Sequence, residues 1–400
     1  MLLSKGFGVY LALIAMASAQ NESQALCAVQ QSVNQFSSAL FPTVAEDISG
    51  DFVLSPLSVS TVLAEAAYGS GGDTKTQFKN VLHLLSPDSL GTPGYQAFID
   101  DLNNVQENKL FLSTNVFIDE KFVVKRNYRS LIENYFRSVL KSVKFAESEE
   151  TLSTVNAWVQ RNTDNRIRDI ADPSGFDAKT AMLLLNVVHS KGQWENKFNP
   201  EYTNEMLFEL DEDTEKFVSM MYRSGVYTCG ELPSREGKFV VIPYKGNELD
   251  MVIVLPDKLS SLSAIEKELQ SINITDIIKL GQERPVQLYL PKFRTKTTVH
   301  LNGPLHKLGL TDMFTSRANF YGLSDDQLAV SRVVQKTFID VNEEGVEAVS
   351  VTGTAQAILS SASHMNFSVN RPFYYNIIKT TKRTGSSVTL FSGHVTEPIT

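Results

Sequence analysis

The sequence predicts an α+β fold, with helices mainly in the first half of the chain and strands mainly in the second. Two helical patterns, at residues 55–68 and 152–167, come before a series of short strand patterns between residues 239 and 342. Helices and strands that are grouped in this way are typical of α+β proteins with more than one sheet. Hydrophobic residues make up 42% of the 400 residues, and no linker-like or repetitive tract divides them. We therefore expect one domain over residues 20–400.

The N-terminal residues 1–19 have the pattern of a secretory signal peptide. Lys5 precedes an apolar run over residues 7–16, and Ala17-Ser18-Ala19 supplies the small residues of a cleavage site before Gln20. The alternative, a buried first helix, fits less well because polar residues follow Gln20 at once. The apolar run is too short to span a bilayer, and the C-terminus carries no retrieval signal. We therefore expect a secreted, extracellular protein that has no membrane partner.

The next elements are marked by their capping and turn residues. Ser55-Pro56 opens the helix over residues 55–68, because proline suits the first turn of a helix. The second helix, over residues 152–167, carries apolar residues on one side. Strands over residues 239–244 and 249–255 flank Lys245-Gly246-Asn247, which is a hairpin signal. Residues 286–291 and 331–342 complete the predicted strands.

Residues 343–352 have the pattern of a strand in a place where a surface loop would be expected. Glu343-Glu344-Gly345 ends the strand over residues 331–342. After this break Val346, Ala348, Ser350 and Thr352 are small and uncharged at alternate positions, whereas Glu347, Val349 and Val351 point the other way. A simple connector between two elements is the alternative interpretation. The alternation favours a segment that is able to enter a sheet.

No constellation typical of an enzyme is found in the sequence. The six histidines do not form a zinc-binding motif, and neither a G-x-S-x-G nor a P-loop sequence occurs. The net charge of −8 disfavours nucleic acid and anionic membranes as partners. We therefore expect no catalytic residues, no metal and no cofactor.

Short motifs in a fixed order connect these elements to one family. They are Phe52 to Ser60, Asn156-Ala157-Trp158-Val159, Leu183 to Asn186, Lys191 to Trp194, Leu290 to Phe293, the Glu343-Glu344-Gly345 hinge, Arg371-Pro372-Phe373, and Leu390 to Pro398. In this order and spacing the chain resembles the serpins, the serine protease inhibitors, from end to end. The resemblance implies three β-sheets, about nine helices and an exposed reactive loop at about residues 345–366.

The resemblance also implies a mechanism and a set of site residues. A secreted serine protease would cleave the loop, which would then insert into the main sheet and trap the acyl-enzyme, so that the protein acts as a suicide substrate. The hinge would comprise residues 343–352, and Glu343 would pair with Lys292. The residues that control the opening of the sheet would be Ser55, Ser58, Asn186, Trp194, Lys292 and Gln335. Gln335 stands where many members carry histidine. A non-inhibitory serpin with a carrier, storage or partner-binding role is the alternative.

The position of the cleaved bond is also inferred from the resemblance. The usual spacing from the hinge glycine places the bond at Leu359-Ser360, and Ser361 or Met365 is the alternative. No Lys, Arg or Asp occurs between Val346 and Asn370, which disfavours trypsin-like proteases and caspases. We expect a monomer whose target is a chymotrypsin- or elastase-like protease.

Secretion raises two further expectations. Asn21, Asn273 and Asn366 each begin an N-glycosylation acceptor sequence. Cys27 and Cys229 could pair in an oxidising compartment. The resemblance, however, places Cys27 in the first helix and Cys229 after the strand that contains Met220, which favours unpaired thiols.

Overall fold

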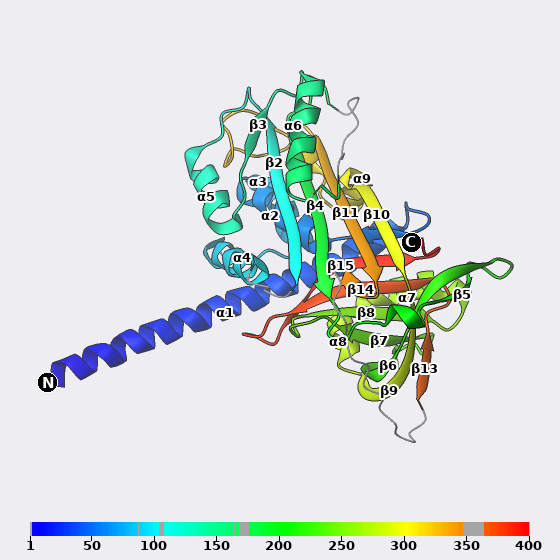
Figure 1. Cartoon of the computed structure of the whole chain (residues 1–400). Helices are drawn as coiled ribbons and strands as arrows, with labels where there is room; N and C mark the ends of the chain where they lie inside the picture. The colour runs from blue at the N-terminus through cyan, green and yellow to red at the C-terminus, as the bar shows by residue number, and fades with distance from the viewer. Residues whose placement is uncertain are drawn as a thin grey trace.

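The computed structural model describes residues 2–86, 88–103, 108–163, 165–167, 176–346 and 364–399. In this part of the chain nine α-helices and fifteen strands are found, which matches the predicted α+β class (Figure 1). The helices are α1 (Leu2–Ala45), α2 (Pro56–Tyr68), α3 (Gly72–Leu82), α4 (Asp88–Asn103), α5 (Arg126–Phe136), α6 (Ser148–Arg161), α7 (Leu262–Ser271), α8 (Ile274–Ile278) and α9 (Asn302–Lys307).

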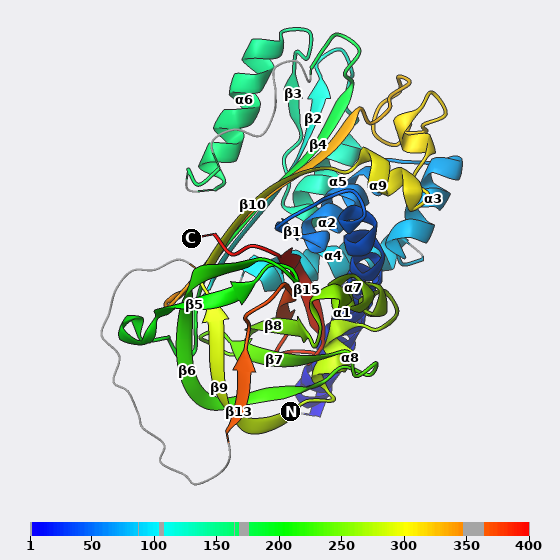
Figure 2. The same ribbon diagram turned by 90° about the vertical axis from the view of Figure 1, so that its right-hand side faces the viewer.

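Six strands form the first sheet, in the order β10-β11-β12-β4-β2-β3. Their bounds are β2 (Lys109–Asp119), β3 (Lys141–Val143), β4 (Met182–Gln193), β10 (Phe293–His300), β11 (Arg332–Asn342) and β12 (Gly345–Val346). Helix α6 covers one face of this sheet, while α2 and its neighbouring helices cover the other (Figures 1 and 2). Val155 and Val159 of α6 pack in a small core with Phe117, Leu185 and Phe338 of the sheet. The sheet is therefore buried on both faces.

The remaining strands form a nine-stranded sheet, in the order β1-β15-β14-β8-β7-β6-β9-β13, with β5 paired to β6. Their bounds are β1 (Phe52–Leu54), β5 (Asn204–Glu209), β6 (Glu215–Glu231), β7 (Gly237–Pro243), β8 (Leu249–Pro256), β9 (Gln282–Pro291), β13 (Met365–Ser368), β14 (Phe373–Thr380) and β15 (Ser387–Val395).

The third sheet that we expected is continuous with the second, because β6 belongs to both. The first part of β6 pairs with β5, its middle pairs with β9 from Met220 to Cys229, and its last four residues pair with β7. A single strand of 17 residues thus joins two groups of strands, so hydrogen bonding links them into one sheet of nine strands.

Two sequence-based boundaries need correction. Helix α6 ends at Arg161, not at residue 167, because Asn165 takes a left-handed backbone conformation (φ +61°) and its amide donates to the Gln160 carbonyl, which closes the last turn. Cys229 lies within β6, the strand that also contains Met220, and not after it. By contrast, α2 begins at Pro56 with Ser55 as its N-cap, as predicted.

The N-terminal helix α1 runs without a break from Leu2 past the predicted cleavage site after Ala19, and its first half projects from the rest of the molecule (Figure 1). Cys27 and Cys229 are both free thiols, in agreement with the favoured interpretation. Within the part of the chain that is described, no helix combines the length and apolar character needed to cross a bilayer.

Candidate functional site: the hinge and the sheet opening

The centre of the site is a two-residue strand, β12, which lies between β11 and β4 at one end of the six-stranded sheet. Gly345 pairs with Asn342 of β11 and with Gln193 of β4, and Val346 pairs with Val341 and Gly192. Both pairings are antiparallel. Further along, β11 and β4 pair directly with each other in parallel, from Arg332↔Leu183 to Phe338↔His189. The chain that leaves β11 therefore turns back at once and occupies the first positions between β11 and β4.

The turn into β12 requires a glycine. Gly345 has a φ of +134°, which side chains rarely adopt. A Cβ atom on this residue would lie 2.2 Å from the Gly192 carbonyl oxygen and 2.9 Å from the Trp194 nitrogen. The close approach allows the Trp194 amide to donate to the Glu344 carbonyl at 3.0 Å, while the Phe198 amide donates to the Glu343 carbonyl at the same distance.

The two hinge carboxylates are each held by a lysine. Lys292 Nζ lies 3.0 Å from Glu343 Oε2, which confirms the predicted contact, and Thr203 Oγ1 donates to Glu343 Oε1 at 2.9 Å. Burial by itself raises the pKa of Glu343, but the hydrogen bonds from its own backbone amide, Lys292 and Thr203 outweigh burial and leave this pKa below 4.5. Lys197 pairs with Glu344. We call Glu343, Glu344, Lys197, Lys292 and Thr203 the hinge latch.

Trp194 contacts the end of β11 next to the hinge latch. Its indole Nε1 donates to the Asn342 carbonyl oxygen at 2.9 Å, and its ring stacks on Tyr244 with centroids 4.5 Å apart. Phe198 contacts the same ring edge-on at 6.1 Å. Trp194 is 1% exposed, so the end of β11 rests on a buried aromatic group.

A second cluster, fully buried, lies further along the sheet, where β4 and β11 still pair. The Gln335 side chain Oε1 accepts from the Ser55 amide at 2.8 Å, and its Nε2 donates to the Ser55 carbonyl, Ser58 Oγ and Asn186 Oδ1 at 2.7–2.9 Å. Ser58 Oγ also donates to Asn186 Oδ1 at 3.0 Å. Ser55, Ser58, Asn186 and Gln335, here called the gate cluster, thus tie β4, β11 and the start of α2 together, so β4 and β11 cannot separate without breaking these bonds.

Most of the remaining predicted positions lie outside the described residues: Glu347 to Thr352, Leu359, Ser360 and Ser361. Met365 begins β13 and pairs with Val286 of β9. A bond within a hydrogen-bonded strand is a poorer protease substrate than one in a free segment, so this geometry disfavours the Met365 alternative. Among the three glycosylation candidates, Asn21 and Asn366 are exposed, while Asn273 caps α8 and is half-buried.

Lys197 and Thr203 were missed by the sequence-based reasoning. Lys197 lies three residues after Trp194, outside the Lys191 to Trp194 motif, and nothing in the sequence pairs it with Glu344. The only available signals were a cation close to Trp194, a position predicted to control the sheet opening, and a hinge carboxylate, Glu344, with no predicted partner.

Comparisons with known proteins agree with this geometry. The family model described as "Serpin (serine protease inhibitor)" matches residues 31–398. The chain belongs to the serpin family. Human neuroserpin is 29% identical over 362 residues, covering 88% of this chain and 87% of neuroserpin. "Antitrypsin" of Bombyx mori is 28% identical over 371 residues, covering 91% of this chain and 94% of that protein. The crystal structure of Serpin48 from Tenebrio molitor has a TM-score of 0.84 and 26% identity, covering 93% of this chain and 98% of that chain.

Family membership supports two of the general expectations from the sequence. Serpins are in general protease inhibitors and not catalysts, and they act on serine proteases.

Proposed function

We propose that this serpin is a secreted suicide inhibitor of a chymotrypsin- or elastase-like serine protease. The observation that carries the proposal is the position of β12. Its two residues are hydrogen-bonded on both sides, antiparallel to β11 and to β4. A freed loop that continued in the same direction would extend β12 down the sheet as a new central strand.

The proposed reaction begins with attack by the protease serine on the carbonyl carbon of Leu359. The bond to Ser360 breaks, the new amino terminus of Ser360 takes up the proton, and Leu359 stays attached to the protease as an ester. Residues 346–359 then enter between β4 and β11. An inserted strand from Gly345 to Leu359 is about 46 Å long at about 3.3 Å per residue, and the attached protease moves over a comparable distance.

The energetics favour insertion once the loop is cut. The direct ladder between β4 and β11 must first open, together with the gate cluster. One ladder is lost and two are formed, one on each side of the new strand, so the net gain is about 12–16 hydrogen bonds at about 1 kcal/mol each. This gain is comparable with the stability of about 5–15 kcal/mol of an ordinary protein. The uncut molecule would then be a kinetically trapped state.

The alternating small residues of the hinge support the same proposal. Val346, Ala348, Ser350 and Thr352 carry no charge, whereas a charge buried without a partner would cost several kcal/mol. Specificity is inferred from Leu359, which suits an apolar pocket, and from the lack of Lys, Arg and Asp between Val346 and Asn370. Secretion, with glycans on Asn21, Asn273 or Asn366, is part of the proposal and is supported by residues 1–19.

Incubation with chymotrypsin, pancreatic elastase and trypsin tests the proposal. We expect a covalent adduct that survives denaturing electrophoresis with one of the first two proteases, and a released C-terminal peptide that starts at Ser360. The Val346→Arg variant places a charge in β12 and should be cleaved without forming the adduct. Val123→Arg, at a site that is 76% exposed, is the matched control and should behave like wild type. Cleavage of the wild type without an adduct would contradict the proposal and favour a non-inhibitory serpin.

A further inference from the structure

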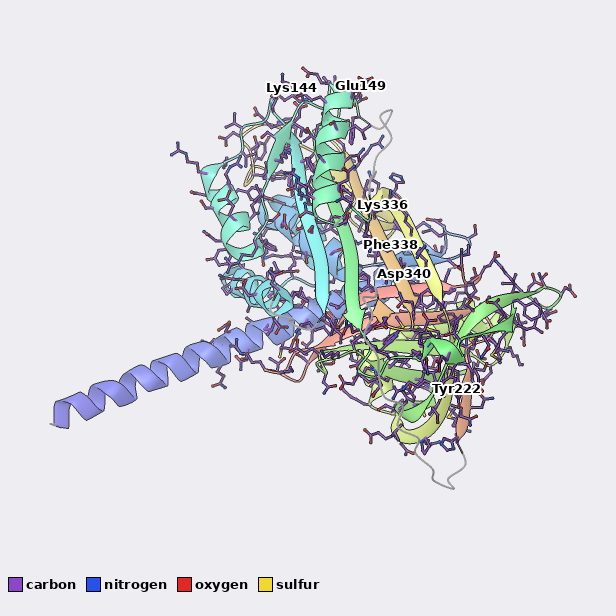
Figure 3. The ribbon with its side chains drawn as sticks, in the orientation of Figure 1. Lys144, Glu149, Tyr222, Lys336, Phe338 and Asp340 are labelled. Atoms are coloured by element: carbon purple, nitrogen blue, oxygen red, sulfur yellow. The ribbon has the colours of Figure 1, made fainter. Side chains whose placement is uncertain are left out.

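The outer face of the strands β6, β9 and β13 carries a row of partly exposed aromatic side chains. Tyr222 of β6 lies directly opposite Tyr289 of β9, with ring centroids 4.8 Å apart. Tyr202, from the short helix Pro200–Tyr202, contacts Tyr222 at 6.5 Å. Val226 lies on the same side of β6, two alternations further along. We call Tyr202, Tyr222, Tyr289 and Val226 the tyrosine face; Figure 3 labels Tyr222.

The tyrosine face is open to solvent, unlike the other side of the same strands. Tyr202 is 50% exposed and Val226 is 58% exposed, while Tyr222 and Tyr289 are half-buried. On the opposite side Val286, Leu288 and Phe367 are fully buried against the core. Of the three tyrosines, Tyr289 packs partly against the main hydrophobic core, so the core accounts for only part of this aromatic row. Partly exposed tyrosines that touch one another are typical of protein-binding surfaces, because they combine a rigid apolar ring with a polar hydroxyl.

This face lies between the two points at which the segment over residues 347–363 joins the described structure. At one end the hinge latch ties Glu343 to Thr203, which directly follows Tyr202, and to Lys292, which directly follows the last residue of β9. At the other end β13 pairs with β9, and Ser368 of β13 is the neighbour of Tyr289. Both ends therefore border the same group of strands (Figure 2).

The length of the segment limits how far from this face a protease can act. Half of the 17 residues over 347–363 reach at most about 30 Å from their attachment points, at about 3.4 Å per residue. A serine protease domain of about 230 residues has a radius of gyration of about 17 Å, so its body is wider than that reach. A protease bound to this segment would come into contact with the strands that anchor it.

We propose that the tyrosine face is a docking surface for the target protease, separate from the cleaved bond, and that it sets the rate at which the protease engages the loop. The surface suits an apolar patch beside the protease's active-site cleft, with hydrogen-bond partners for the tyrosine hydroxyls. The inference rests on the proposed inhibitory function, but it concerns how fast the loop is cut and not what happens afterwards.

The test compares Tyr222→Ala with Tyr321→Ala, a matched tyrosine that is 51% exposed in the connection between α9 and β11. The protein is produced without glycans, because Asn366 lies on the same side of β13 as Ser368. The rate constant of loop cleavage is measured from the released C-terminal peptide, so it is obtained whether or not an adduct forms. We expect Tyr222→Ala to lower this rate constant about tenfold, whereas Tyr222→Phe and Tyr321→Ala retain it.

Further readouts separate docking from folding and from inhibition. The ratio of adduct to cleaved serpin, and the unfolding temperature, should be the same for Tyr222→Ala and wild type. Tyr202→Ala should also lower the rate constant. Because Tyr202 is more exposed than Tyr222, this variant keeps the test valid if Tyr222→Ala misfolds. Rates within twofold of wild type for both variants, with every protease that cuts the loop, would overturn the proposal. A wild-type dimer that the variants abolish would also overturn it, because a second copy would then cover this face. If no adduct forms but Tyr222→Ala and Tyr202→Ala still lower the rate constant of loop cleavage, only the proposed inhibitory function is refuted.

Discussion

Glu65 is a carboxyl group inside α2 with almost no contact with water. Its Oε1 accepts from Thr114 Oγ1 at 2.9 Å, and Tyr128 donates to its backbone carbonyl. Burial raises the pKa of Glu65 to about 8, against a smaller lowering effect of the hydrogen bonds from Thr114 and Ser138. At neutral pH this side chain is therefore mostly protonated, and the folded protein binds a proton that the unfolded chain releases.

The Glu65→Gln variant should become more stable than wild type as the pH rises. Because the folded-state pKa lies above 4.5, the wild-type carboxyl stabilises the fold fully only below pH 4.5 and loses that stability up to about pH 8. Glutamine does not titrate, so the difference should grow from below about 1 kcal/mol at pH 5 to on the order of 4 kcal/mol at pH 8. Urea unfolding midpoints at the two pH values measure it. An equal difference at both values would contradict a raised pKa.

In contrast to Glu65, Glu343 is stabilised in its charged form by its neighbours. The Lys292→Ala variant leaves it with Thr203 and should destabilise the hinge by about 1–3 kcal/mol at pH 7. Because the pKa of Glu343 is lowered, its contribution is present above pH 4.5 and is lost as the pH falls further. We expect the unfolding midpoint to fall at pH 7 and to approach that of wild type near pH 3. Lys382→Ala, which breaks the exposed pair with Glu248, should have little effect at either pH.

At the scale of elements, β12 shows how a two-residue strand depends on one glycine. Its backbone approaches β4 so closely that no side chain fits at Gly345. The same position is also the starting point of the proposed inserted strand. Insertion would therefore have to preserve the close backbone pairing of Gly345 with β4 that the uncut molecule already has.

The Gly345→Ala variant should lose the β12 pairing. A Cβ only 2.2 Å from the Gly192 oxygen must displace backbone, and the positive φ adds about 1–3 kcal/mol of strain. We expect a lower thermal midpoint and a larger share of cleaved serpin relative to adduct in the protease assay. Gly385→Ala is the control, since Gly385 also has a positive φ, +68°, but no atom within 4 Å of an added Cβ. An unchanged adduct fraction in Gly345→Ala would show that the hinge does not pass through this geometry.

At the scale of the whole molecule, the six-stranded sheet contains two different arrangements of β4 and β11. At one end β12 separates β11 from β4, and further along these strands pair directly across the gate cluster. Helix α6 covers the face of the sheet opposite the gate cluster, with Val155 and Val159 packed in the same core as Phe338, which Figure 3 labels on β11. Opening the sheet must therefore disturb α6 as well as the gate cluster, which provides a barrier between the two arrangements.

Cleavage of the loop should raise the thermal unfolding midpoint by about 15–20 °C. The net gain of about 12–16 ladder bonds is the cause, at about 1.2 °C per kcal/mol for a chain of this size. Calorimetry before and after limited proteolysis measures the change. The Val346→Arg variant, cut at the same bond, should show almost no rise. An unchanged midpoint in the cut wild type would mean that the loop does not insert.

The sequence by itself determined the features that depend on local pattern. Ser55-Pro56 predicted the start of α2, the hairpin between β7 and β8 followed from Lys245-Gly246-Asn247, and ordered motifs predicted the family and the Glu343–Lys292 contact. These predictions held because capping, turn geometry and motif order act over a few residues or are read directly from the chain.

The tertiary structure alone decided what depends on contacts between distant residues. The partner of Glu344 is Lys197, Gln335 bridges two strands and a helix, and β6 belongs to two groups of strands. Helix α6 ended early because the chain turns at Asn165, whose amide donates back to the Gln160 carbonyl. None of these has a local signature, because a lysine, a glutamine or a long strand is compatible with many surroundings. Only the folded backbone brings the groups within hydrogen-bonding distance, and that proximity decides which contacts form.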